Sequence, residues 1–506
     1  MLVKISSASL IGIEAYLVDV EVDVALGIPG FITVGLPDAS IRESRDRVKA
    51  ALKNCGYTFP SRKVTINLAP ADRRKEGSGF DLPISLGLLA HLELIPVEQL
   101  DEYIFLGELA LDGNLKAVKG ILSSTVLARN KGFRGVVIPK GNVKEAALVQ
   151  GIDIYGMENL SQVVQLLRDP QTVLPAKYSL EDLLQQREFG VDFKDVKGQQ
   201  HVKRALEVAV AGGHNVLLIG PPGAGKTMIA RRLPTIFPPL TFDEIIEVTQ
   251  IYSASGLLLE KYAVGERPFR APHHTITDAG LIGGGIIPKP GEVSLAHHGV
   301  LFLDELPEFK RRVLEDLRQP LEDGKVTVSR SFMSITFPSA FMLIAAMNPC
   351  EDAYRGLVSS EFDCTEAQRN RYYSKISGPL MDRIDIQLEV PRIKFRDIIS
   401  REEGECSAYI RTRVIESRER QRQRFKSQKI SCNARMGTKE VKKYCQVTQE
   451  GKELLEMAVN RLGFSARAYT RVLKVARTIA DLSKEDEISP VCLSEAIQYR
   501  MMDKYF

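Results

Sequence analysis

The sequence predicts an α/β protein with more than one domain, and three observations support this. The chain has 506 residues, which is too many for a single hydrophobic core. Apolar residues alternate with acids over 16–24, as in a strand with one buried face. Through 395–506 apolar residues recur at helical spacing instead, so the last part of the chain is expected to be all helical.

The composition is that of an ordinary globular protein. Hydrophobic residues make up 44% and charged residues 26%, and the net charge of +4 neither requires nor excludes a nucleic-acid partner. Seven cysteines without a CxxC pair fit a reducing compartment better than a disulfide scaffold. Acids occur from Glu14 onward, unlike a signal peptide, and no apolar run is long enough for a membrane span. We therefore expect a cytoplasmic protein with no membrane partner.

The first elements are predicted in residues 1–170. After the strand over 16–24, "GLPDASIRESRDRVKAALKNCG" predicts a helix with Asp38 as its N-cap and Gly56 at its C-terminal stop. Further strands and helices follow. Between 171 and 190 the strand pattern is lost and prolines appear, so we interpret this stretch as a linker or a first short helix.

A glycine-rich loop follows an apolar run and begins a helix in "NVLLIGPPGAGKTMIARRL". It matches GxxxxGK[ST], in which glycines let backbone N–H groups turn toward phosphate at a helix N-terminus. Lys226 would reach the β- and γ-phosphates, and Thr227 would offer its hydroxyl to Mg²⁺. A chance match is the alternative, and the strand-to-helix context disfavours it. The residues predicted to bind ATP are Gly220, Pro221, Pro222, Gly223, Ala224, Gly225, Lys226, Thr227 and Met228.

A second apolar run, "GVLFLDELPEF", ends in two acids. Asp304 would hold Mg²⁺ together with Thr227, and Glu305 would orient or deprotonate the attacking water. An ordinary strand that happens to end in Asp-Glu is the alternative. The two motifs predict a nucleotide-binding core over 191–392 that uses ATP and Mg²⁺.

Two segments inside this core are predicted to have a functional role. "DGKVTVSRSFMSITFPS", residues 323–339, alternates on both sides of a polar turn and predicts a hairpin with Arg330 at or near its tip. Residues 267–299 form a long Gly/Pro-rich excursion, and such loops are usually functional. Its histidine pairs, 273/274 and 297/298, are not expected to bind a metal, because adjacent side chains on extended backbone point apart.

Seven motifs, in chain order, carry a family resemblance: "GPPGAGKT", "RPFRAPHHT", "GEVSLAHHGVLFLDELPEF", "LRQPLEDGKVTVSR", "AAMNPC", "KISGPLMDRID" and "SARAYTRVLKVARTIADL". With "GLPDASIRESRDRVKAAL" and "RRKEGSGFDLPISLGLLA" before them, the chain resembles the ComM/YifB-type, magnesium-chelatase-like AAA+ ATPases over nearly its whole length. The resemblance implies an N-terminal Lon-protease-like α+β domain over 1–170. It also implies an AAA+ core over 191–392 with a parallel sheet and a pre-sensor hairpin, and a magnesium-chelatase-type helical lid over 393–506.

The resemblance also implies roles for polar residues that follow the acidic strand. Asn348 would sense the γ-phosphate, and Arg383 would be an arginine finger for the ATP of a neighbouring subunit. The alternatives are an asparagine that caps a strand end and a salt bridge from Arg383 to Asp382 or Asp385. A finger given to a neighbour requires a ring, and the family implies a homo-hexamer.

In the lid, arginines of two kinds stand out. Arg467 in "SARAYT" matches the family's lid arginine, which couples nucleotide state to the lid angle, and Arg471 is the second choice. The stretch "RTRVIESRERQRQRF", residues 411–425, has six arginines against two glutamates. It could follow a phosphate backbone, although a charged helix face in water is the commoner explanation.

A Lon-like domain raises the possibility of proteolysis, which needs a serine nucleophile and a lysine base. The protease pattern places Gly79 at the serine position and Ser124 at the lysine position, so we expect the dyad to be absent. Ser78 and Lys119 leave a shifted dyad as the alternative. The domain is then expected to organise the ring or to touch DNA, with a solvated surface as the alternative for its basic residues. These are Arg42, Arg45, Arg47, Lys49, Lys53, Arg73, Arg74 and Lys75.

A structural zinc site is not predicted. The family often has four cysteines after the sensor asparagine, but here only Cys350 and Cys364 remain, with Asp352 and Phe362 in the other two places. Phenylalanine cannot bind a metal, so both cysteines are expected to be free thiols.

Taken together, these features predict a ring-forming AAA+ ATPase that acts as a DNA motor, a helicase or branch-migration enzyme in DNA uptake and recombination. Lys325 and Arg330 on the hairpin, with the insert over 270–290, are expected to grip the phosphate backbone without base preference. The alternatives are a magnesium-chelatase-type motor subunit, which the N-terminal region disfavours, and a protein-remodelling ATPase.

Overall fold

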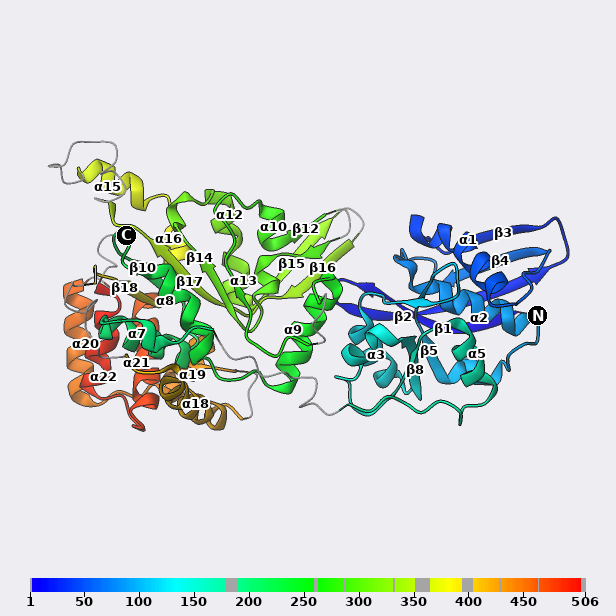
Figure 1. Ribbon diagram of the computed structural model, residues 1–506. Coiled ribbons are helices and arrows are strands. Elements are labelled where there is room, and N and C mark those ends of the chain that lie inside the picture. Colours follow the sequence, from blue (N-terminus) through cyan, green and yellow to red (C-terminus); the bar gives the residue numbers. More distant parts are fainter. Residues whose placement is uncertain are drawn as a thin grey trace. The chain divides into compact units, whose positions relative to one another are not determined.

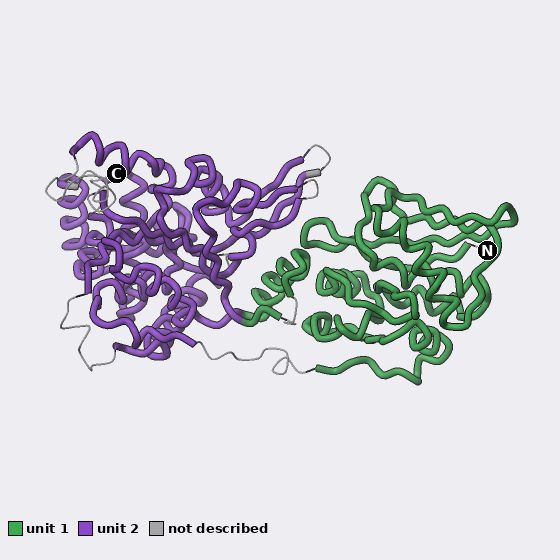
Figure 2. Tube along the Cα trace, turned by 45° about the horizontal axis from the view of Figure 1, so that its top comes forward, with its two compact units in different colours: residues 1–186, 241–265 green, residues 187–240, 266–506 purple. Residues whose placement is uncertain are grey.

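The computed structural model describes residues 2–178, 190–258, 263–285, 288–330, 333–350, 365–393, 404–426, 430–462 and 464–501. The chain forms two compact units, which Figure 2 distinguishes by colour. The first comprises 1–186 and 241–265, and the second comprises 187–240 and 266–506. Helix α9 (Phe242–Ser255) therefore belongs to the first unit, although the sequence places it inside the predicted range of the nucleotide-binding core.

Two sheets form the framework of the first unit. The larger has the order β1-β2-β4-β3, in which β2 is antiparallel to β1 and β4, and β3 is parallel to β4. The smaller has the order β5-β8-β9 and is parallel, and a short ladder joins β6 to β7. The strands are β1 (Val3–Ile11), β2 (Glu14–Ala25), β3 (Gly30–Val34), β4 (Lys63–Ala69), β5 (Tyr103–Phe105), β6 (Glu108–Leu109), β7 (Leu115–Lys116), β8 (Gly135–Pro139) and β9 (Asp153–Met157).

The helices of the first unit begin and end as local chemistry requires. Asp38 is the N-cap of the first helix, as predicted, because its carboxylate accepts the N–H of Ile41 at 2.9 Å. Gly56 follows the helix with φ of 82°, which confirms it as the C-terminal stop. Besides α9, the helices are α1 (Ala39–Asn54), α2 (Asp81–His91), α3 (Ile121–Lys131), α4 (Val143–Ala146) and α5 (Leu160–Arg168).

The predicted strand over 16–24 is confirmed as part of β2. Val18, Val20, Val22 and Val24 are buried on one face and pack in the core of the first unit. Helix α2 is buried along nearly its whole length and contacts β1 and β2, so this helix and the valine face form one hydrophobic core.

A five-stranded sheet lies at the centre of the second unit (Figure 1). Its order is β11-β14-β17-β10-β18, and every neighbouring pair is parallel. Two antiparallel hairpins, β12 with β13 and β15 with β16, are separate from it. The strands are β10 (Val216–Ile219), β11 (Phe269–Arg270), β12 (Gly283–Gly284), β13 (Lys289–Pro290), β14 (Val300–Leu303), β15 (Lys325–Arg330), β16 (Met333–Pro338), β17 (Met342–Met347) and β18 (Ile386–Glu389).

Helices surround this sheet and make up the C-terminal part of the unit. The predicted all-helical region is confirmed among the described residues, and its apolar faces share one core with the parallel sheet. None of the described helices combines the length and apolar character that a membrane crossing requires. The helices are α7 (Gln200–Gly212), α8 (Lys226–Arg232), α10 (Asp278–Ile282), α11 (Glu292–Leu295), α12 (Arg311–Asp316), α13 (Arg318–Asp323), α15 (Glu366–Tyr373), α16 (Gly378–Met381), α18 (Ser407–Arg424), α19 (Thr438–Tyr444), α20 (Gln449–Leu462), α21 (Ala466–Leu482) and α22 (Pro490–Gln498).

Candidate nucleotide-binding site

Three neighbouring strands of the parallel sheet end in polar motifs. The glycine-rich loop follows β10, Asp304 and Glu305 follow β14, and Asn348 follows β17. Because all three strands run in the same direction, their carboxyl ends meet at one edge of the sheet. The topology therefore brings together residues that the sequence places more than a hundred positions apart.

The glycine-rich loop needs its glycines for two different reasons. Gly223 and Gly225 have φ of 79° and 86°, a region that other residues avoid. At Gly220 a Cβ atom would lie 2.2 Å from the carbonyl oxygen of Val390, so no side chain fits there. Helix α8 begins directly after the loop, and the N-terminal end of a helix favours negative charge.

Lys226, the first residue of α8, lies over this loop. Its ammonium donates to the carbonyl oxygen of Gly220, to that of Pro221 at 3.0 Å and to Asn348 Oδ1 at 2.9 Å. The predicted phosphate-binding lysine and the predicted γ-phosphate sensor are thus direct neighbours. Tyr372 holds the sensor strand end by donating to the carbonyl oxygen of Asn348 at 2.9 Å.

The two predicted Mg²⁺ ligands are also in contact. The Thr227 hydroxyl donates to Asp304 Oδ2 at 2.6 Å, and the other carboxylate oxygen accepts the N–H of Glu305 at 3.0 Å. Glu305 has φ of 54° and ψ of 48°, the left-handed conformation that is costly for a residue with a side chain. Such strain is typical of functional sites. Here the left-handed conformation of Glu305 makes the chain turn sharply after the acidic strand.

A pocket of about 270 Å³ opens beside these acids, lined among others by Thr227, Arg231, His273, His274, Asp304 and Glu305. His274 Nδ1 lies 3.4 Å from Glu305 Oε2, a contact that the motif analysis missed. The only available signal was the position of "RAPHHT" in the long excursion before the acidic strand.

The histidine pairs differ from expectation. The rings of His273 and His274 are 4.1 Å apart, and those of His297 and His298 are 3.9 Å apart. The assumption of extended backbone was wrong at both places. The N–H of Ile276 donates to the carbonyl oxygen of His273 at 3.0 Å, which makes a turn, and His298 has φ of 55°. Turns bring adjacent side chains together instead of apart.

The residues of this edge fit a nucleoside triphosphate with Mg²⁺. A loop with no room for a side chain at Gly220 and with positive φ at Gly223 and Gly225 leads into a helix N-terminus, and a lysine lies over it. A hydroxyl and a carboxylate, 2.6 Å apart, are oxygen ligands of the type that Mg²⁺ prefers. Glu305, with 57% of its side chain exposed, is accessible beside them.

A second polar cluster contains the two other predicted arginines. Arg383 forms an ion pair with Glu322, and Arg467 forms one with Asp382 at 2.8 Å. The proposed alternative for Arg383 as a salt-bridge residue is therefore half right, because the ion pair exists but its partner is neither Asp382 nor Asp385. Arg467 keeps 70% of its side chain exposed in this arrangement.

Asp385 is the buried centre of a third group of contacts. Its carboxylate accepts the N–H of Asn215 at 3.2 Å, lies 3.4 Å from His214 Nδ1 and is ion-paired with Arg471. Burial alone would raise the pKa of Asp385, but the charge of Arg471 and the hydrogen bond to His214 lower it well below the usual range. Arg471, the second choice for the lid arginine, thus joins α21 to the sheet.

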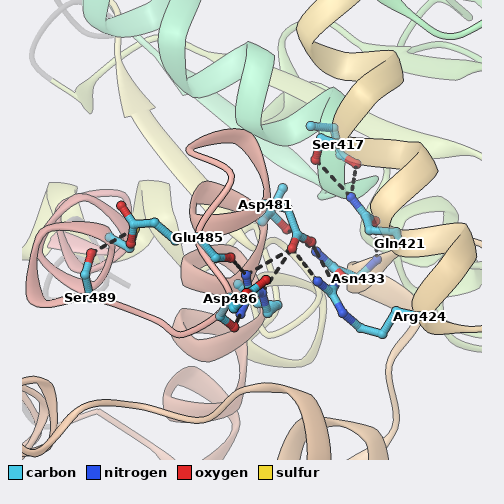
Figure 3. A network of polar contacts seen from close by, with 12 residues as sticks. Ser417, Gln421, Arg424, Asn433, Asp481, Glu485, Asp486 and Ser489 are labelled. Carbon is cyan, nitrogen blue, oxygen red and sulfur yellow. Dashed lines mark hydrogen bonds and ion pairs between the residues drawn. The ribbon is translucent and has the colours of Figure 1, made fainter.

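The C-terminal helical region contains a dense polar network around Asp481 (Figure 3). Asp481 is fully buried and pairs with Arg424 and Arg477, and it accepts from Asn433 Nδ2 at 2.8 Å. Gln421 of α18 donates to the carbonyl oxygen of Ala211, which ties the network to α7.

The basic stretch over 411–425 is partly used by these contacts. Arg424 binds Asp481, Arg413 pairs with Glu207 and Glu405, and Arg418 donates to the carbonyl oxygen of Val210 at 2.9 Å. Three of its arginines therefore hold α18 in place. These three of its six arginines contribute to the fold of the C-terminal helical region.

The predicted hairpin is confirmed, with Arg330 paired to Met333 next to the turn. Lys325 lies at the opposite end of β15. Because side chains alternate along a strand and the two residues are an odd number of positions apart, Lys325 and Arg330 lie on opposite faces of the ribbon. Arg330 Nε donates to the carbonyl oxygen of Gly285 at 3.3 Å, so the hairpin tip contacts the insert over 270–290.

In the first unit, the residues at the protease positions have structural contacts. Ser78 hydrogen-bonds to the carboxylate of Glu108, and Ser124 donates to the carbonyl oxygen of Gly120 at 3.0 Å. A Cβ atom on Gly256, in the segment that joins this unit, would meet Lys119 Nζ at 2.8 Å. Ser78 thus bonds to Glu108, and the Lys119 ammonium lies beside Gly256.

Several basic residues of the first unit also contact groups within that unit. Arg47 forms a bidentate pair with buried Asp81, and Lys75 is buried with its ammonium donating to the carbonyl oxygen of Arg73 at 2.8 Å. The ammonium of Lys49 lies over the ring of Phe59. These contacts hold three of the eight basic side chains against groups of their own unit.

Cys350 is not a free thiol, contrary to expectation, because it is disulfide-bonded. Two thiols can close a bridge only when the backbone brings them within a few ångströms, which sequence spacing did not indicate. Cys364, Asp352 and Phe362, the other positions of the zinc prediction, lie outside the described residues.

Known protein families match the chain in three places. The family described as magnesium chelatase, subunit ChlI, matches residues 192–398, a second ChlI model matches 20–142, and the ChlI C-terminal model matches 404–500.

Relatives match the chain over its full length. It is 43% identical to the uncharacterized protein YifB of Salmonella typhimurium, over 99% of this chain and 97% of that protein. It is also 43% identical to the competence protein ComM of Haemophilus influenzae, over 98% and 97% of the two chains. A more limited similarity, 30% identity over 164 residues, links it to Lon protease 2 of Bacillus subtilis.

Proposed function

This chain belongs to the magnesium chelatase ChlI family of AAA+ proteins, with full-length relatives named ComM and YifB, and on that premise we propose that it is a ring-forming ATPase that moves along DNA. The observation that carries the proposal is the meeting of three polar motifs at one sheet edge, where Lys226 contacts Asn348 and Thr227 contacts Asp304. The name of the Haemophilus relative, a competence protein, supports a role in DNA uptake.

Each residue of the edge has a task in the proposed reaction. The backbone N–H groups of the glycine loop hold phosphate oxygens, and Lys226 exchanges its bonds to loop carbonyls and Asn348 for the β- and γ-phosphates. Thr227 and Asp304 would hold Mg²⁺, which would supply positive charge against the charge of the transferred phosphoryl group. Glu305 accepts a proton from the attacking water, and His274 at 3.4 Å orients its carboxylate.

The second arginine cluster supports assembly into a ring. Arg383 would complete the site of a neighbouring subunit, and Arg467 would report the nucleotide state to the lid through its ion pair with Asp382. A residue given to a neighbour acts only in a closed assembly, for which we propose a homo-hexamer.

The hairpin supplies a surface suited to a phosphate backbone. Lys325 shares its face with two hydroxyl pairs, Thr327 with Thr336 at 3.0 Å and Ser329 with Ser334 at 2.9 Å. Hydroxyl groups and lysine are common phosphate ligands and read no base sequence. Arg330 adds positive charge at the tip, beside the insert.

The test is the ATP turnover rate with and without four-way-junction DNA, at low and high salt. We expect DNA to raise turnover severalfold at low salt, with the stimulation falling as salt rises. Lys226→Ala should abolish turnover, while Lys131→Ala, an exposed lysine at the end of α3, should leave it unchanged. Turnover that DNA does not stimulate at low salt would contradict the motor proposal.

The chelatase-type motor subunit is the second candidate, because the family model that matches the core is that of a magnesium chelatase subunit. Active turnover without any response to DNA would favour it or a protein-remodelling ATPase.

A further inference from the structure

Within its own subunit the guanidinium of Arg383 is held by two contacts. One nitrogen is ion-paired with the carboxylate of Glu322, and another donates to the carbonyl oxygen of Pro379 at 2.6 Å. Only 16% of the Arg383 side chain is exposed, and among the described residues its Nε has no hydrogen-bond partner. The side chain is thus turned inward, although it is not fully satisfied there.

The backbone around Arg383 is fixed from two sides. Asn215, at the start of β10, donates to the carbonyl oxygen of Arg383 at 2.8 Å. The neighbouring acids Asp382 and Asp385 pair with Arg467 and Arg471 of the lid helix α21. The main chain is therefore pinned, and the Arg383 side chain is the part that can change its partner.

Glu322 belongs to the element that leads into the hairpin. It lies in the last turn of α13, and Gly324, with φ of 65°, separates that helix from Lys325. The N–H of Ser339 donates to the carbonyl oxygen of Gly324 at 2.8 Å, which closes the base of the hairpin against the helix end. Glu322 and the hairpin strand are thus separated along the chain only by Asp323 and Gly324.

The Glu322 contact is suited to be reversible. The side chain of Glu322 is 67% exposed, and ion pairs in contact with water are weak. A triphosphate at a subunit boundary, shielded from water, is a stronger partner for a guanidinium.

We propose that Glu322 is a positioning residue that holds Arg383 away from the neighbouring nucleotide until a polyanion engages the hairpin. This inference rests on the proposed function. When a polyanion binds to the hairpin face that carries Lys325, the end of α13 is displaced and Glu322 separates from Arg383. The Arg383 guanidinium is then free to reach the nucleotide of the neighbouring subunit. The contact thus links the polymer-binding element to hydrolysis in the next site along the ring.

The test uses the full chain with Glu322→Gln, which removes the charge and keeps the shape. We expect the turnover rate without DNA to rise about three- to tenfold, toward the DNA-stimulated rate, while the stimulated rate stays unchanged. The ratio of the two rates should therefore approach one. Glu416→Gln is the matched control, because Glu416 is also exposed and ion-paired, with Lys484 at 2.9 Å, and it should change neither rate.

A second variant separates this role from a structural one. Glu322→Gln combined with Arg383→Ala should have the same rate as Arg383→Ala alone, because the glutamate acts only through the arginine. Glu322→Asp, whose shorter side chain weakens the contact, should give an intermediate rate without DNA. Melting temperatures of all variants identify any that fail to fold.

Two results would overturn the proposal. A rate without DNA that falls in Glu322→Gln would mean that the glutamate supports the finger, and an unchanged ratio would mean that the contact has no role. Failure of the proposed function would give different results from these two. It would appear as full turnover in Arg383→Ala, or as no stimulation by DNA in the unmodified chain.

Discussion

The two units use their polar side chains in opposite ways. In the first unit, Ser78, Ser124 and the Arg47–Asp81 pair bond to groups of the same fold. In the second unit, polar motifs meet at the carboxyl ends of three strands, and Thr227, Asp304 and Glu305 among them border a pocket. The difference is one of strand direction, because parallel neighbours collect their strand ends at one edge, whereas the larger sheet of the first unit is mostly antiparallel.

Buried carboxylates show the same contrast. Burial raises the pKa of Asp81 to about 6 even though Arg47 opposes the shift, and burial likewise raises the pKa of Glu145. For Asp385 in the second unit, the charge of Arg471 and the contact with His214 outweigh burial and lower the pKa. The hydrogen bonds around Asp81 and Glu145 do not offset desolvation, whereas the charge of Arg471 and the contact with His214 do so at Asp385.

The largest effect should come from changing the lysine over the glycine loop. Lys226→Ala should lower ATP turnover by about a hundredfold or more, because the phosphates lose their nearest cation. Ser78→Ala, its counterpart in the first unit, should leave turnover unchanged, and we expect neither the unmodified chain nor this variant to cleave casein. Phosphate release and a casein digest measure both, and casein cleavage that depends on Ser78 would break the comparison.

The next largest effect should be a loss of stability in Asp385→Ala. Removing the buried acid leaves Arg471 and His214 without their partner, at a cost of about 3–5 kcal/mol in the free energy of unfolding. Urea denaturation of the full chain measures it. Asp382→Ala, which breaks the exposed pair with Arg467, should cost at most about 1 kcal/mol. Equal losses in the two variants would contradict a buried hub at Asp385.

The smallest effect concerns pH. The pKa of Asp81 is about 6 in the folded chain and about 4 when unfolded, so the folded state binds its proton more tightly. Its contribution to stability is therefore largest below about pH 4 and is lost as pH rises to about 6, a change of about 2–3 kcal/mol.

Hydrogen exchange of α2 peptides between pH 4 and 7, corrected for intrinsic rates, should show protection that declines over this window. Asp81→Asn should flatten the decline. A decline that persists unchanged in Asp81→Asn would assign the effect to another group, with Glu145 the first to test.

Much of the fold could be predicted from sequence, because the relevant signals are local. The alternating valines of β2, the N-cap Asp38 and the glycine loop before α8 each depend on residues within a few positions of one another. Helix α9 could not be assigned to its unit in this way. Its Ser253 donates to buried Glu145 at 2.5 Å and accepts the N–H of Gly120, contacts that join residues more than a hundred positions apart.

For the site, the functional residue types could be identified from the sequence, whereas the structure showed which of these residues contact one another. Thr227, Asp304, Lys226 and Asn348 were predicted individually, and their contacts follow from the parallel order of the strands. Three features were not predicted, namely the His274 contact to Glu305, the pairing of Arg383 with Glu322 and the disulfide at Cys350. Each depends on a turn or a long-range approach that residue spacing does not encode.

The sequence by itself determined the family, the element types and the phosphate-binding loop, because these depend on residue periodicity and on short motifs whose geometry is nearly fixed. Only the tertiary structure decided that Arg383 is held by Glu322 beside the hairpin and that Asp385 is the buried junction of lid and sheet. The reason is that folding decides which segments become neighbours. These neighbours determine which partner a side chain contacts and in which protonation state a titratable group is stable.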